Sequence, residues 1–141
     1  MKLGILATTA LFSTLCLAAP VKAENPADVK QLMETRECAD CDLAGANLSN
    51  THLIGADLRN ANLKGANLTG ANLEGADLTG ANLKDAKLLQ VFASGASLND
   101  ANLTGVNLTG ANLYNAEMEG ATLAGANLKG TKLYGAEPSG Y

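Results

Sequence analysis

The sequence contains no tryptophan, a single histidine, and few aromatic residues, which make up 4% of its 141 residues. Cysteine and proline are also scarce, with three of each. So little histidine and cysteine leaves almost no material for catalysis or metal binding, and we expect no enzyme, no metal and no cofactor. Hydrophobic residues still account for 47% of the chain, so a core must be built from small aliphatic side chains. The length predicts one small domain.

Positive charge is limited as well. Ten Lys and Arg stand against fourteen Asp and Glu, for a net charge of −4. Binding to nucleic acid through phosphate contacts needs clustered Lys and Arg. The charge therefore predicts no nucleic-acid partner.

The first 23 residues have the pattern of a secretory signal. Lys2 supplies a positive charge, residues 3–19 form an apolar run, and Val21 and Ala23 place small residues at a cleavage site before Glu24. The alternative is a membrane-spanning anchor, but the run is short for a span and a cleavage site follows it. We expect removal of residues 1–23, export, and no stable membrane anchor in the mature chain.

From Cys41 to Gly135 the chain repeats every five residues through nineteen blocks without insertion. The central position is Leu in seventeen blocks, with Ala93 and Met118 as exceptions, and the position two earlier is Ala in fourteen. The last position is Gly in thirteen blocks and Asn or Asp in five, and only Gln90 departs from that column. A period this strict outranks any local helix or strand preference.

This period excludes both regular elements. Five residues turn an α-helix by about 500°, so successive leucines would drift around its surface. An odd period reverses the face of a flat strand at every repeat. A short extended step followed by a corner fits, because Ala and Leu two apart point the same way and Gly, Asn or Asp tolerates positive φ. The chain is therefore predicted to wind, with Ala and Leu inward.

Blocks such as Ala66-Asn67-Leu68-Thr69-Gly70 resemble the pentapeptide repeat family, whose motif centres on Leu or Phe with a small residue two positions earlier. The resemblance implies an all-β fold, a right-handed quadrilateral β-helix with four repeats per coil. Nineteen repeats would make nearly five coils, a rod about 25 Å long. We expect three segments: residues 1–23 as signal, 24–40 as an N-terminal capping helix and linker, and 41–141 as the repeat β-helix.

The segment before the repeats predicts a short helix over residues 26–35 that covers the first coil. Asn25 can cap it, Pro26 suits its first turn, and Val29, Leu32 and Met33 form one apolar stripe at helical spacing.

Cys38 and Cys41 are the cysteines left after processing. Outside the cytoplasm a nearby pair favours a disulfide, and a zinc site would need a second pair. A redox-active Cys-x-x-Cys is the alternative, although no thioredoxin-like context surrounds it. Some secreted members of the family are similar, and in them such a pair joins an N-terminal helix to the first coil.

With four repeats per coil, residues twenty apart stack on the outer surface. One outward column carries an acidic stripe, with a neighbouring acid beside it: Asp57, Asp77, Glu117 and Glu119. It is either a solvated face or, less simply, a cation site at Asp57 and Asp77.

A second side carries unusual outward apolar residues, with one more on the adjacent side: Ile54, Phe92, Tyr114, Tyr134 and, adjacent, Leu89. Such a cluster marks a possible partner surface. Phe92 and Leu89 also flank Ala93, where the central Leu is missing, so either residue could instead turn inward and fill the space.

These features favour a non-enzymatic exported scaffold that displays a β-helical surface to another protein. Its resemblance to short exported members of the family, frequent in cyanobacteria, implies the periplasm or thylakoid lumen. A DNA-mimicking topoisomerase inhibitor is one alternative, since some acidic members of the family act so, but export opposes it. A thiol-redox protein using Cys38 and Cys41 is the other.

Overall fold

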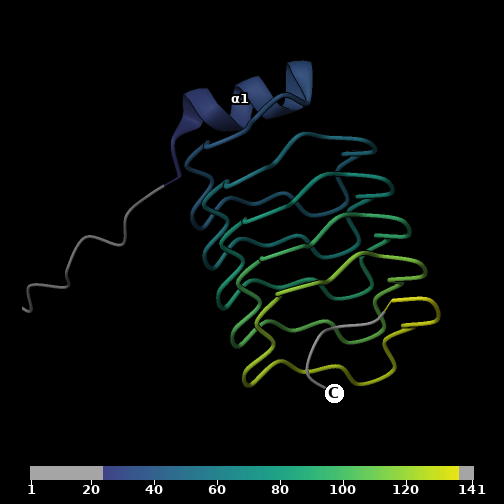
Figure 1. Ribbon diagram of the computed structural model, residues 1–141. Coiled ribbons are helices and arrows are strands. Elements are labelled where there is room, and N and C mark those ends of the chain that lie inside the picture. Colours follow the sequence, from purple (N-terminus) through teal and green to yellow (C-terminus); the bar gives the residue numbers. More distant parts are fainter. Residues whose placement is uncertain (1–23, 137–141) are drawn as a thin grey trace, which may run out of the picture.

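The structure is a computed structural model that describes residues 24–136; the predicted signal segment lies outside them. The chain winds into a stack of coils with one helix, α1, across the N-terminal end (Figure 1). Each isolated β-bridge of the described residues joins positions twenty apart in parallel, from Glu37↔Asp57 to Asn112↔Lys132. Four repeats therefore complete one coil, as the family resemblance implied.

Each repeat forms one side of a coil. We number the sides by the first coil: side 1 contains residues 41–45, side 2 contains 46–50, side 3 contains 51–55 and side 4 contains 56–60. Repeats twenty residues earlier or later belong to the same side. The bridges stay isolated because the chain turns a corner before a second consecutive residue can pair.

The corners follow one backbone pattern. At the first, the Ala46 N–H donates to the Leu43 carbonyl at 3.1 Å across a turn whose third residue, Gly45, has φ +72°. A third turn residue with positive φ is the signature of a type II turn, which favours Gly or Asn. Gln90 adopts φ +53° at the equivalent position without the conformational freedom of glycine.

Neighbouring coils are joined by backbone hydrogen bonds. The Leu43 N–H donates to the Asn62 carbonyl at 2.8 Å, and the Asn62 N–H donates back to the Cys41 carbonyl at 2.8 Å. The outward Asn of each repeat also supports its own backbone: Asn67 Oδ1 accepts the Thr69 N–H at 3.2 Å and the Thr69 hydroxyl at 2.7 Å. This local turn explains why Asn precedes Leu in so many repeats.

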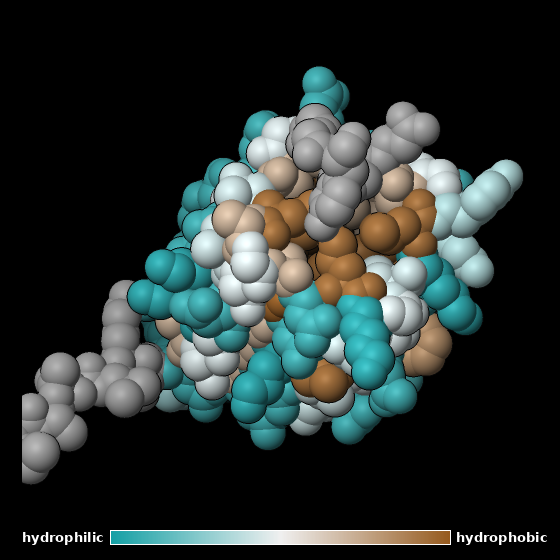
Figure 2. Space-filling model, turned by 90° about the horizontal axis from the view of Figure 1, so that it is seen from below, coloured by the Kyte–Doolittle hydropathy of each residue, from teal (hydrophilic) through white to brown (hydrophobic). Residues whose placement is uncertain are grey.

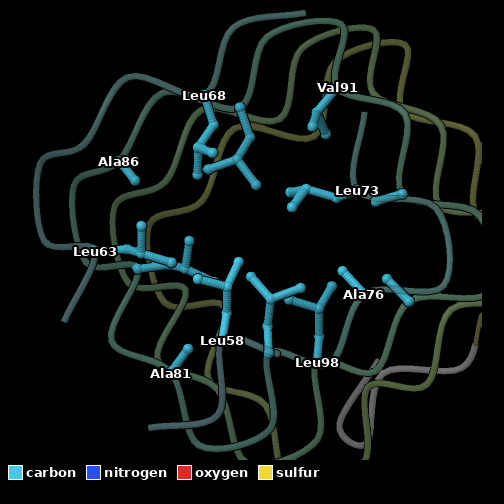
Figure 3. Close-up of a cluster of buried hydrophobic side chains, with 14 of the residues drawn as sticks. Leu58, Leu63, Leu68, Leu73, Ala76, Ala81, Ala86, Val91 and Leu98 are labelled. Atoms are coloured by element: carbon cyan, nitrogen blue, oxygen red, sulfur yellow. The ribbon is translucent and has the colours of Figure 1, made fainter. Parts of the chain in front are cut away.

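The interior consists of stacked Leu and Ala side chains that point toward the axis (Figure 3). The central leucines from Leu43 to Leu113 are almost fully buried, and burial of each contributes about 1.5–3 kcal/mol before entropy is counted. Ala93 is also buried, and beside it Val91 occupies a position that is usually Ala. The larger Val91 thus compensates in part for the smaller Ala93.

Helix α1 spans Pro26–Thr35, as predicted. Asn25 Oδ1 accepts the Ala27 N–H at 3.1 Å, which is the expected N-cap. Leu32 is fully buried and Val29 packs partly against the core. The prediction that Met33 belongs to the buried stripe is wrong, since its side chain is 51% exposed. The face of α1 that contains Leu32 packs on the coil beneath, and Met33 points away from that face.

The coils begin earlier than the expected boundary at Cys41. Glu37 already bridges to Asp57, and Cys38 takes the central inward position with 0% exposure. The deviation is caused by the missing Leu: Cys38 fills the space of a central leucine, so the repeat is not visible there in the sequence. Residues 37–40 are therefore a side 4 repeat that stacks on 57–60 and precedes the first coil numbered above, rather than a linker.

The opposite end of the stack is more open. Leu123, Leu128 and Leu133 of the last described coil are half-buried, whereas the central leucines of the inner coils are covered on both sides. Seen from this end, apolar side chains gather at its middle (Figure 2). The core is therefore continuous but loses cover toward residue 136.

Candidate functional site

The aromatic surface of side 3 is the most distinctive outward feature. Large hydrophobic side chains exposed among the described residues are Met33 on α1 and four on side 3: Ile54 at 46%, Phe92 at 49%, Tyr114 at 40% and Tyr134 at 82%. A soluble solenoid needs apolar residues only inside, so their concentration on one of four sides is not required by the fold.

Tyr114 and Tyr134 occupy the same outward position in neighbouring coils, and their rings are in contact. Their ring centroids are 6.4 Å apart at an interplanar angle of 85°, an edge-to-face arrangement. The ammonium of Lys132 lies 6.0 Å from the Tyr114 ring centroid. Ile54 lies farther along the same column, three coils away from Tyr114, with Glu74 and Ser94 between them. Tyr114 and Tyr134 are therefore in contact, and Phe92 lies on the same side one coil before Tyr114.

Phe92 points outward, so the alternative in which it fills the space beside Ala93 is wrong. Val91 occupies that region instead, with 0% exposure. Leu89 is half-buried on side 2, near the corner with side 3. The sequence could not decide which of these residues fills the space beside Ala93. Inward and outward positions are adjacent in the chain, and the interior space at Ala93 is bounded by side chains of neighbouring coils.

A groove runs along the corner between sides 2 and 3, and sequence reasoning missed it. It has a volume of about 470 Å³ and is lined by Asn50, Gly70, Gln90, Val91, Phe92, Gly110, Asn112 and Lys132. We call it the corner groove. The Asn50 side chain lies over Gly70 and the Gln90 side chain lies over Gly110, while Phe92 forms the aromatic wall of the groove. The signal in the sequence was the departure at Gln90, which stands twenty residues from both glycines.

The acidic stripe lies on side 4, but it is not a row of free carboxylates. Arg59 Nε and Nη2 donate to the two oxygens of Asp57 at 2.8 and 2.6 Å. The same guanidinium is 3.9 Å from Asp77 Oδ2. This hydrogen bond holds the pKa of Asp57 below its usual value, against a smaller opposing effect of partial burial.

The guanidinium occupies the position that a cation between Asp57 and Asp77 would take. Within residues 24–136 no group of three His, Cys, Asp or Glu could hold a metal ion. Farther along the stripe Ser97 interrupts the acids, and Asn99 Nδ2 donates to Glu117 Oε2 at 3.0 Å. The Glu119 N–H donates to Asn99 Oδ1 at 2.8 Å. The carboxylates of the acidic stripe are thus hydrogen-bonded to neighbouring side chains, and Arg59 neutralises part of their charge.

Cys38 and Cys41 form a disulfide, as predicted, with Cα atoms 5.2 Å apart. They lie at the first corner of the coil stack, in the positions of an inward Leu and the following Ala. The bridge therefore closes that corner and does not tie α1 to the coils. Their exposures are 0% and 7%, so the sulfurs are not presented to a redox partner.

Comparison with protein families gives a match to the model described as pentapeptide repeats over residues 37–75, 76–113 and 101–137. The chain therefore belongs to the pentapeptide repeat family. The comparison with curated proteins found no match. In the part of the chain that the structure describes, no helix has the length and apolar character needed to cross a bilayer.

Three solved structures illustrate the relatives. A pentapeptide repeat protein of the cyanobacterium Cyanothece 51142 is 31% identical, covering 81% of this chain and 95% of that one, with a TM-score of 0.46. One from the Arabidopsis thaliana thylakoid lumen is 33% identical, covering 82% and 73%, with a TM-score of 0.45. HetL of Nostoc, involved in regulation of heterocyst differentiation, is 32% identical, covering 74% and 65%, with a TM-score of 0.44.

Proposed function

We propose that this protein is a non-enzymatic exported scaffold that binds another protein through the aromatic surface of side 3. The observation that carries the proposal is the exposure of Phe92, Tyr114 and Tyr134 on one side of a rod whose fold does not need them there. In protein–protein interfaces, a few residues contribute most of the binding energy, and aromatic and cationic side chains are frequent among them.

Export forms part of the proposal because of residues 1–23, which carry a positive start, an apolar run and a cleavage pattern. We place the mature chain in the periplasm or the thylakoid lumen, the latter being the compartment of the Arabidopsis relative. N-terminal sequencing of the full chain expressed in a cyanobacterial host tests this point. We expect a mature protein that begins at Glu24, and an unprocessed chain in the cytoplasm would contradict export.

The right-handed sense of the coils and the role of α1 as an end cap belong to the same proposal. Two contacts support the cap: Asp28 Oδ2 accepts the Asp42 N–H at 2.8 Å, and Gln31 Nε2 donates to the Glu37 carbonyl at 2.6 Å. These side chains satisfy edge groups that have no preceding coil, and Leu32 covers the core. Solenoids require such terminal covers to remain soluble.

Affinity capture from the exported fraction tests the binding surface. The mature protein is compared with Tyr114→Ser and Phe92→Ser, and Met33→Ser serves as control because it removes a similarly exposed apolar side chain from α1. We expect a partner that is lost with both side 3 variants and retained with the control. Equal capture by all four proteins would refute the assignment of the surface.

The two alternatives are tested more simply. A DNA mimic presents negative charge to its target, whereas Arg59 pairs with Asp57 and Ser97 interrupts the acidic stripe. We therefore expect the mature protein to leave gyrase supercoiling unchanged. Because the disulfide is buried, we also expect no activity in an insulin-reduction assay.

A further inference from the structure

The departures from the repeat pattern between residues 89 and 93 separate into two groups in the structure. Val91 and Ala93 are buried and adjust the volume of the core. Gln90 and Phe92 face outward and line the corner groove together. Neither side chain of the second pair enters the core, and Gln90 adopts a positive φ that Gly or Asn takes more easily. A ligand at the groove would account for both.

The groove has the length of a short extended peptide. Its lining runs from Asn50 in the first coil to Lys132 in the fifth. Four coil steps of about 4.8 Å correspond to about 19 Å, which an extended segment of about six residues would span at 3.3 Å per residue. The side chains of Asn50 and Gln90 lie over Gly70 and Gly110, so their amide groups form the floor on which such a segment would lie.

The chemistry of the lining is that of a site for an acidic segment with one apolar side chain. It offers the Phe92 ring, the amides of Asn50, Gln90 and Asn112, and the ammonium of Lys132, and it contains no carboxylate. Amides can pair with the peptide backbone, which presents both donors and acceptors.

The distribution of charge over the rod agrees with this chemistry. Sides 2 and 3 together carry Lys87, Lys129 and Lys132 against the single acid Glu74. Side 4 instead carries seven carboxylates and two arginines. Although the protein is acidic as a whole, sides 2 and 3 carry a net positive charge, which favours an anionic segment at the corner between them.

We propose that the corner groove binds an extended acidic peptide segment of the partner, with an apolar side chain against Phe92 and a carboxylate at Lys132. This inference rests on the proposed function, because it names the chemistry of the partner that side 3 binds. Lys132 also lies over the Tyr114 ring, so the groove and the aromatic surface are continuous.

The test uses the mature protein and three fluorescein-labelled hexapeptides: one of Glu and Asp with a central Phe, one with Lys in place of the acids, and one acidic peptide with Ser in place of Phe. Fluorescence anisotropy measures binding, and amide shifts in NMR locate it. We expect the acidic Phe peptide to bind about tenfold more tightly than the others, with shifts at Gly70, Gln90 and Gly110.

Two variants and a matched control make the result specific. Lys132→Glu and Phe92→Ser should each weaken binding of the acidic Phe peptide about tenfold or more. Lys84→Glu, the same exposed charge change on side 1, should weaken it less than twofold. Unchanged melting temperatures would show that the variants fold.

Equal binding of acidic and basic peptides, or an equal loss with Lys84→Glu, would overturn the groove assignment. If the captured partner still depends on Tyr114 while no acidic peptide binds, this inference fails and the proposed function stands. If no partner depends on side 3 and no peptide binds, both fail. If the peptide binds at the groove and the captured partner does not compete with it, the groove is not the partner site and the inference is wrong.

Discussion

The corners of neighbouring coils are coupled, and this coupling gives a sharp prediction at Gly80. Both Gly75 and Gly80 have positive φ, +62° and +69°. A methyl group added at Gly75 would meet nothing within 4 Å, whereas at Gly80 it would lie 2.5 Å from Asn60 Oδ1. The two substitutions Gly75→Ala and Gly80→Ala therefore share the backbone strain and differ in one contact.

The magnitude follows from these two effects. Alanine in the left-handed region costs about 1–2 kcal/mol, which applies to both variants. Relief of the contact with Asn60 requires a side-chain rotation or a backbone shift, and overpacking of this kind costs about 1–3 kcal/mol. We expect Gly75→Ala to destabilise by about 1–2 kcal/mol and Gly80→Ala by about 2–5 kcal/mol.

Urea unfolding followed by far-UV circular dichroism measures both variants, together with Asn60→Gly and the double variant Asn60→Gly/Gly80→Ala. The double variant should return to the level of Gly75→Ala, which corresponds to a coupling energy of about 1–3 kcal/mol. If Gly75→Ala and Gly80→Ala cost the same, or if Asn60→Gly gives no relief, the reasoning about stacked corners is refuted.

Three further predictions concern the core, the stripe and the disulfide. Leu78→Ala should cost about 3–5 kcal/mol in urea unfolding, and Leu128→Ala in the open last coil about half as much; equal costs would mean that the end is covered. Arg59→Ala removes the cation that lowers the pKa of Asp57. A lowered carboxyl pKa stabilises the fold above the unfolded-state pKa, and this contribution is lost as pH falls through the folded-state pKa, so the variant should lose less stability than wild type between neutral pH and about pH 2; an unchanged difference would contradict the pairing. Cys41→Ala should lower the melting temperature and loosen the first coil in hydrogen exchange while amides near Leu78 keep their protection; uniform loss of protection would contradict a local role.

The candidate surface shows what a repeat pattern can and cannot predict. The outward placement of Ile54, Tyr114 and Tyr134 follows directly from the position of each residue in its repeat. Phe92 was ambiguous, since Ala93 leaves space inside. Val91 resolved the ambiguity, because its larger side chain enters the interior from the position usually held by Ala.

The order of residues along the chain determined the winding, the inward Leu and Ala columns, the turn residues and the helix over Pro26–Thr35. These features depend on contacts within one or two repeats, so the local pattern specifies them. Even the disulfide between Cys38 and Cys41 lies within one corner.

Only the tertiary structure determined the features that depend on contacts with a neighbouring coil. It set the start of the coil stack at Glu37, the exposure of Met33, the contact of Arg59 with Asp77, and the corner groove. Each of these depends on residues from different coils or from α1 and a coil. Their contacts exist only after the chain has stacked, and a five-residue pattern carries no direct record of its neighbour twenty residues away.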